Sequence, residues 1–261
     1  MAANPIFGDQ ERLSFVSSLE LPDAHHHARI GLGATPAPAP APTIKDGEQS
    51  TFIAGGSVVS FASGVSGQNQ KDVLNSTLLA QLACDKMYDR EKQITDWYKF
   101  YHSILENVGW VIQGFDFSEY KADGDKFEAD KAILEILGAV VSQNELLIIK
   151  SAIEAAKSLP TTDGRITLFD RFSSSGGAGS FQIGLATEEK NVVAMKLGAF
   201  LFSTKTNETR VLWFKFSKKD SSLSKSTQTV TLNSDVYAQV RDTVQQKLGE
   251  MAKTFVANLT L

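Results

Sequence analysis

Histidine is the side chain best suited to proton transfer near neutral pH and to metal binding, and this chain has four. Three of them are consecutive, His25, His26 and His27. Neighbouring side chains on a regular backbone cannot all converge on one tetrahedral ion, and no Cys/His pair stands at zinc spacing. The fourth, His102, follows a run of aromatic residues on an expected helix, where a packed imidazole is the commoner finding. The sequence therefore predicts no metal and no cofactor.

Pairs of acidic residues and one Gly/Ser segment are the next features that could do chemistry. The pairs Asp123/Asp125 and Glu188/Glu189 fall in expected turns, where carboxylates commonly bond nearby backbone donors. The Gly/Ser segment 173–180 precedes an alternating strand and lacks the Lys-Ser or Lys-Thr pair of a phosphate-binding loop. An enzyme would therefore have to assemble its site from distant residues. The best placed contributors, near the ends of expected elements, are His102, Asp116, Asp170 and Arg171.

The single cysteine, Cys84, cannot close an internal disulfide and lies in the apolar stretch LLAQLAC. We interpret it as a small buried hydrophobe, with a reactive or acylated thiol as the alternative. The lack of disulfides, of a signal peptide and of a long apolar span predicts a cytoplasmic product, and later release is not forbidden. With 26 basic and 30 acidic side chains, the net charge is -4, so nucleic acid is not an expected partner.

Residues 1–48 differ in composition from the rest of the chain. They end in a Pro/Ala alternation that favours an extended polyproline II course. The prolines that define it are Pro36, Pro38, Pro40 and Pro42. We expect an extended arm outside the core, followed by a single α+β domain over 49–261.

Helices are predicted mainly in the first half of this domain. A strand is expected over 51–63, with Gly55-Gly56 as a bulge or bend, and a second over 110–117. Apolar residues spaced by three and four predict helices between them and after them, including one that Ser142 begins through a capping box. The predicted helices cover 71–88, 94–108, 127–141 and 142–156.

After Arg165 the apolar period changes from 3.6 to 2, which predicts a mainly antiparallel sheet over 165–232. The alternating runs are 181–185, 193–201, 212–216 and 230–232. Short polar connections make the first three an expected meander, and the Ser-rich stretch 218–225 an expected loop. Asn233-Ser234-Asp235 then caps an amphipathic C-terminal helix whose apolar stripe runs to Phe255.

Both faces of this expected sheet carry large apolar groups. Phe200 and Phe202 oppose Leu201, and Trp213 opposes Phe214. Such a sheet needs cover on both sides, either from its own helices in three layers or from a partner or membrane.

The leading hypothesis is a non-enzymatic interaction or self-assembly protein that forms homo-oligomers. Its predicted partner is a protein, either another copy or a different chain. The residues assigned to this interaction are Pro36, Pro38, Pro40, Pro42, Phe200, Phe202 and Trp213. The second hypothesis is a membrane-active effector or toxin that inserts amphipathic hairpins, based on the Ser/Thr/Lys-rich strands 196–216 and 226–232. The third is an enzyme whose site is not visible in the sequence.

Overall fold

A computed structural model describes residues 8–22, 42–121, 125–175, 177–205, 215–217 and 219–259. Their fold is α+β, as the sequence predicts. The helices are α1 (Asp9–Ser18), α2 (Gly67–Met87), α3 (Ile94–Asn107), α4 (Ala129–Gly138), α5 (Gln143–Ser158), α6 (Gly164–Ser173), α7 (Ser234–Leu248) and α8 (Met251–Thr254). The strands are β1 (Ser50–Ala54), β2 (Ser57–Phe61), β3 (Trp110–Val111), β4 (Ser118–Glu119), β5 (Lys126–Glu128), β6 (Ser174–Ser175), β7 (Ala178–Glu189), β8 (Val192–Thr204), β9 (Lys215–Ser217), β10 (Ser221–Leu232) and β11 (Val256–Asn258).

The main sheet has the order β11-β1-β2-β7-β8-β10-β3, with β4 on β10 and β6 on β7. The pairing of β2 with β7 is parallel, and the other pairings are antiparallel. Its centre is a meander of three long strands, β7, β8 and β10, of 12, 13 and 12 residues. Lys190 and Asn191 form the turn between β7 and β8, both with positive φ, which short hairpin turns require.

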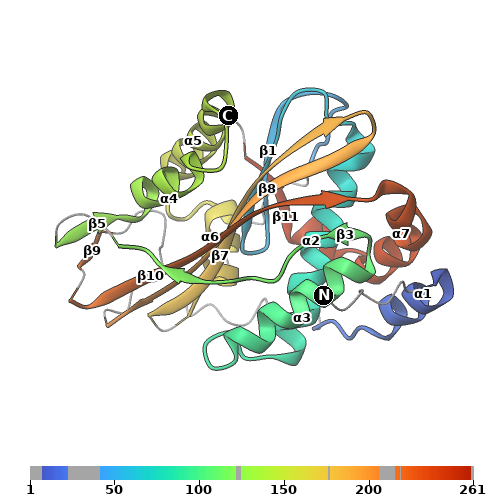
Figure 1. Cartoon of the computed structure of the whole chain (residues 1–261), viewed down its shortest axis with the longest axis horizontal. Coiled ribbons are helices and arrows are strands. Elements are labelled where there is room, and N and C mark those ends of the chain that lie inside the picture. The colour runs from blue at the N-terminus through green and yellow to red at the C-terminus, as the bar shows by residue number, and fades with distance from the viewer. Residues whose placement is uncertain are drawn as a thin grey trace.

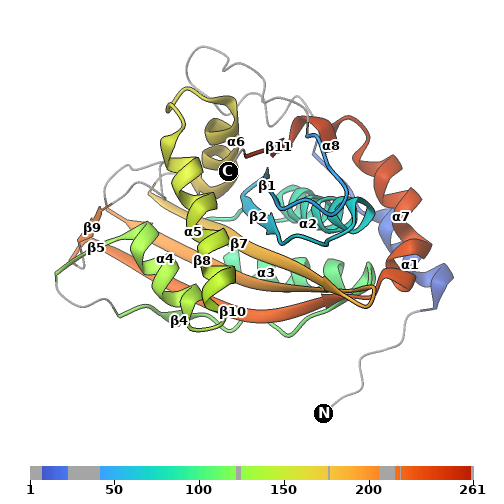
Figure 2. The same cartoon turned by 90° about the horizontal axis from the view of Figure 1, so that it is seen from above.

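Helices cover this sheet on both faces, in the three-layer arrangement that its two apolar faces call for (Figures 1 and 2). The pair α4 and α5 lies over one face of the meander. On the other side lie α2, α3 and α7, and α1 packs outside α7. The apolar residues of all three layers form one continuous core.

Helix α2 is buried on nearly all sides, although it carries polar residues. Gln81, which is 1% exposed, accepts a hydrogen bond from Gly56 N at 2.8 Å and donates to Ala54 O and Ser57 Oγ, each at 3.1 Å. Ser57 in turn donates to Gln182 on β7 at 3.2 Å. These bonds satisfy the buried polar groups and fix α2 against the sheet.

Two sequence predictions about strands were wrong. The single strand expected over 51–63 is the hairpin β1–β2, because Gly55 takes a φ of 55° and turns the chain back on itself. The first part of the sheet expected over 165–232 is instead helix α6, where Asp163 caps the chain by accepting a hydrogen bond from Arg165 N at 2.9 Å.

The order of the meander also differs from the prediction. The expected third run, 212–216, lies partly outside the described residues, and β9 at its end pairs with β5 in a separate two-stranded sheet. The neighbour of β8 is β10, which includes residues 221–225 of the stretch expected to be a loop and pairs with β8 from Ser221 to Leu232. Ser and Thr side chains made this segment resemble a loop, but they are compatible with a strand near the sheet edge.

The predicted extended arm contains helix α1, and residues 1–7 and 23–41 lie outside the described part. Val16 is fully buried, and Arg12 donates to Glu106 O and Asn107 O at 2.8 and 2.9 Å. These are carbonyls at the C-terminal end of α3, which a cation stabilises. At the other end of the chain, the predicted C-terminal helix divides into α7 and α8 at Gly249, whose φ is 48°.

Candidate functional site

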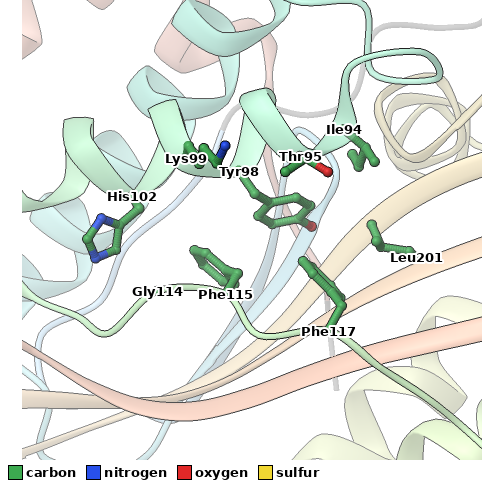
Figure 3. A pocket seen from close by; sticks show the side chains of 9 residues that line it. All are labelled: Ile94, Thr95, Tyr98, Lys99, His102, Gly114, Phe115, Phe117 and Leu201. Atoms are coloured by element: carbon green, nitrogen blue, oxygen red, sulfur yellow. The ribbon is translucent and has the colours of Figure 1, made fainter.

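A pocket of about 400 Å³ lies between α3 and the loop that connects β3 with β4 (Figure 3). Its lining is mainly aromatic and aliphatic, with a few polar groups from α3. The lining residues are Ile94, Thr95, Tyr98, Lys99, His102, Gly114, Phe115, Phe117 and Leu201. A concave apolar site with a few polar groups is the usual form of a small-molecule pocket.

Helix α3 supplies one wall because its aromatic residues follow the helical period. Trp97, Tyr98 and Tyr101 are 1%, 4% and 1% exposed, which confirms the predicted inward stripe. Phe100, between these positions on α3, is half-buried, with its ring centroid 5.8 Å from that of Tyr88.

The loop 112–117 forms the opposite wall and is fixed at its start by two hydrogen bonds. His102 Nε2 lies 3.1 Å from Ile112 O, and Gln113 N donates to Gln228 Oε1 at 3.0 Å. Figure 3 shows Tyr98 reaching from α3 toward the phenylalanines of the loop. The ring centroids of Phe115 and Phe117 each lie 4.8 Å from that of Tyr98. Sequence reasoning missed these phenylalanines as a site because it placed them on a strand.

The hydroxyl of Tyr98 is the most unusual polar group of the pocket. It is buried, and its hydrogen-bonding contacts with the side chains of Gln182 and Ser180 are weak. Burial raises the pKa of Tyr98 to about 12, although the charge of Arg90 and these contacts lower it in part. The phenol therefore stays protonated and can donate a hydrogen bond.

The second feature of functional interest is the face of the meander beneath α4 and α5. Phe181 on β7 stacks on Phe200 of β8 at 5.0 Å, with Phe202 next to them. The backbone of Gly198 faces α4 so closely that a Cβ there would lie 2.8 Å from Leu137 Cδ2. Lys196 Nζ on the same strand donates to Glu145 Oε2 of α5 at 2.6 Å.

The residues predicted to serve an interaction are dispersed. Phe200 and Phe202 are 0% and 4% exposed, so the folded chain covers them with its own helices instead of offering them to a partner. Pro42 is half-buried at the edge of a groove with Thr43 and Ile44. Pro36, Pro38, Pro40 and Trp213 lie outside the described residues.

The residues considered for catalysis do not form one site. His102 lines the aromatic pocket, and Asp116 lies on its loop. Asp170 and Arg171 belong to α6, whose Phe169 packs on Phe181, on the sheet face opposite the pocket. Among the described residues, no group of His, Cys, Asp and Glu is placed to hold a metal ion.

Cys84 is fully buried on α2, with its Sγ 3.5 Å from Trp97 O. Burial is the main cause that raises the pKa of this thiol well above its ordinary value, with a smaller contribution from Asp85. A thiol in this state is a poor nucleophile.

No helix in the described part of the chain has both the length and the apolar character to cross a bilayer.

No protein-family model matches the sequence, and no curated protein matches it either. Among solved structures, the Evf virulence factor is similar at 9% identity, a TM-score of 0.34 and coverage of 82% of this chain and 85% of that one. A delta-endotoxin is similar at 15% identity, a TM-score of 0.37 and coverage of 79% and 95%. The activated Cyt2Ba monomer from Bacillus thuringiensis subsp. israelensis follows at 15% identity, a TM-score of 0.29 and coverage of 52% and 79%. All three likenesses are low in both sequence identity and TM-score.

Proposed function

We propose that this chain is a membrane-active, toxin-like protein that is stored in a folded form and inserts its long hairpins into a bilayer. The observation that carries this proposal is the apolar face of the β7–β8–β10 meander, closed behind the helix pair α4–α5. Moving that pair away together with α6, whose Phe169 packs on Phe181, would expose Phe181, Phe200 and Phe202 together. An exposed apolar surface of this kind favours transfer into lipid.

The lengths of the strands support the proposal. A strand needs about 9–11 residues to cross the hydrocarbon core of a bilayer when tilted. The three strands of the meander have 12, 13 and 12 residues. Each therefore has enough residues to cross, with one or two left for the interface.

The pattern of β7 also suits insertion. Phe181, Ile183 and Leu185 alternate with Ser180, Gln182 and Gly184. Successive side chains of a strand point to opposite faces, so β7 has one apolar face and one polar or small face. The apolar face is the one that α4, α5 and α6 cover in the folded protein.

The cover is a separate layer, joined to the sheet by side-chain packing and by the Lys196–Glu145 pair. Helices α4 and α5 also pack on each other and are joined by the ion pair of Lys157 with Asp130. The two helices could therefore move away from the sheet together.

Release of a trapped fluorescent dye from liposomes tests the proposal. We expect release from at least one of several lipid compositions between neutral and acidic pH, increasing with protein concentration. The same protein held oxidised by an engineered disulfide, described in the Discussion, is the matched control. Retention of the dye across all compositions and pH values would reject membrane activity.

Self-assembly remains a second candidate because of how α1 packs. Its Val16 is buried, Arg12 bonds the end of α3, and Lys247 of α7 donates to Ser17 O at 2.8 Å. The surface of α3 and α7 on a second copy of the chain could bind α1 in the same way. Exchange of such an arm between copies builds oligomers. Light scattering of the full chain and of one that begins at Glu48 tests this, and two monomeric masses would reject exchange through the arm.

A further inference from the structure

We propose that the pocket between α3 and the loop 112–117 binds a small aromatic carboxylate. Its volume of about 400 Å³ is in the range of small-molecule sites, which is about 300–1,000 Å³. The proposal concerns the folded, soluble chain, and it holds whether or not the protein breaches membranes.

The walls of the pocket favour a planar ring over other apolar groups. Tyr98, Phe115 and Phe117 present three rings within one small space, with Phe115 and Phe117 at an interplanar angle of 18°. Aromatic rings attract one another in offset or edge-to-face arrangements, beyond the gain from burying area. Ile94 and Leu201 complete an apolar wall for the body of such a ligand.

The polar groups of the pocket favour a carboxylate. Thr95, Tyr98 and Lys99 stand at positions i, i+3 and i+4 of α3, so their side chains lie on one face of the helix and all three line the pocket. Two hydroxyl donors and an ammonium group match the two acceptor oxygens and the negative charge of a carboxylate. The hydroxyl of Tyr98, 4% exposed as a residue, has only weak hydrogen-bonding contacts, with the side chains of Gln182 and Ser180. A buried donor that is so poorly satisfied is unfavourable, and a ligand oxygen would complete its hydrogen bonding.

Nearby charges leave the ammonium group of Lys99 available. Its side chain is 74% exposed and pairs with Asp96 at 3.7 Å, an exposed pair that contributes little. Of the other carboxylates near the pocket, Glu106 lies 3.4 Å from His102 Nδ1, and Asp116 is exposed on the loop 112–117. Lys99 can therefore turn toward a ligand at small cost.

The proposal is tested on the full chain at pH 7, without lipid, by calorimetric titration with 2-naphthoate. We expect saturable binding of one molecule per chain. Lys99→Gln should weaken the binding of 2-naphthoate about tenfold, the usual order for losing a charge-assisted bond, and leave that of neutral 2-naphthalenemethanol unchanged. The matched control is Lys92→Gln, since Lys92 is 81% exposed, pairs with Asp89 at 3.4 Å and does not line the pocket.

A second variant, Tyr98→Phe, separates a ligand role from a structural one. Because the hydroxyl is only weakly hydrogen-bonded in the described part of the structure, its removal should leave the melting temperature unchanged or higher and still weaken 2-naphthoate binding several-fold. A lower melting temperature would show that the hydroxyl serves the fold, against the proposal.

The proposal is also overturned if 2-naphthoate does not saturate, if Lys99→Gln and Lys92→Gln behave alike, or if decanoate binds more tightly than 2-naphthoate. None of these results depends on dye release, so the failure of one proposal leaves the other standing.

Discussion

Lys196 on β8 and Glu145 on α5 form an ion pair that joins the central strand of the meander to the helix layer above it. Their Nζ and Oε2 atoms lie 2.6 Å apart, and the side chains are 28% and 16% exposed. The same Oε2 accepts a hydrogen bond from Ser142 N at 2.6 Å, which closes the capping box of α5. One carboxylate thus begins the helix and holds it to the sheet.

This geometry predicts that acid weakens the fold through Glu145. Burial would raise the pKa of Glu145, but the hydrogen bonds from Lys196 and Ser142 outweigh it and hold the pKa below 4.5. A carboxyl whose pKa is lower in the folded than in the unfolded protein contributes its full stabilisation at pH values above its ordinary pKa. This contribution is lost as the pH falls through the pKa of the folded protein. Urea unfolding at a series of pH values should show wild type losing more stability below about pH 4.5 than Glu145→Gln.

The control for that experiment is Glu154→Gln on the same helix. The side chain of Glu154 is 65% exposed, and it pairs with Lys150 at 3.7 Å. This variant should follow the wild-type pH dependence. If Glu145→Gln did so as well, the pair with Lys196 would not be what acid disrupts.

A buried ion pair on the opposite layer gives a prediction about stability. Asp72 of α2 has a fully buried side chain and accepts two bonds from Arg241 of α7, with Nε–Oδ1 at 3.0 Å and Nη2–Oδ2 at 2.7 Å. Replacing Arg241 leaves Asp72 buried and uncompensated, so Arg241→Gln should lower the free energy of unfolding by about 3–5 kcal/mol. Urea denaturation measures the change. Asp242→Asn, an exposed position beside Arg241, should change it little, and equal effects would contradict the buried pair.

The thiol of Cys84 should not react in the native protein. It is fully buried, and burial raises its pKa, so both access and the thiolate fraction are minimal. A chromogenic thiol reagent should detect no thiol at pH 8 in buffer and one thiol per chain in denaturant. Rapid labelling without denaturant would favour the alternative interpretation of a reactive cysteine.

Local signals in the sequence predicted several elements well. Ser142 and Asn233 begin α5 and α7 where their capping patterns indicate, and the stripe of Trp97, Tyr98 and Tyr101 is buried as expected. Helix α6 was missed because its start depends on Asp163, a single cap in a stretch otherwise interpreted as the start of a sheet. A strong local pattern decides whether a segment becomes a helix or a strand. Where the local pattern is weak, tertiary packing decides.

The site was less predictable than the fold. The pocket forms because the loop carrying Phe115 and Phe117 returns to Tyr98, held by His102 and Gln228. Gln228 is more than one hundred residues away along the chain, and no local spacing reveals such a contact. For the same reason, the sequence shows that the sheet has two apolar faces, but it does not show which segments of the chain cover them.

The central claim, that α4 and α5 must leave the sheet for the protein to act on membranes, can be tested with a disulfide. Leu137→Cys and Gly198→Cys place two thiols where Leu137 now approaches the strand, since a Cβ at position 198 would lie 2.8 Å from Leu137 Cδ2. Removing the leucine also removes the methyl groups that this Cβ would strike, and the Phe200 ring, 2.9 Å from the same Cβ, must shift slightly. The single variant Leu137→Cys, which cannot form the bridge, is the control, since Gly198→Cys alone would clash with Leu137.

Dye release from liposomes by the double variant, oxidised and then reduced, is the deciding measurement. We predict that the oxidised protein leaves the dye inside and that reduction restores release to the level of the Leu137→Cys single variant. Equal release by the oxidised and reduced forms would contradict the claim, because the meander would then be acting while α4 is still bound to it.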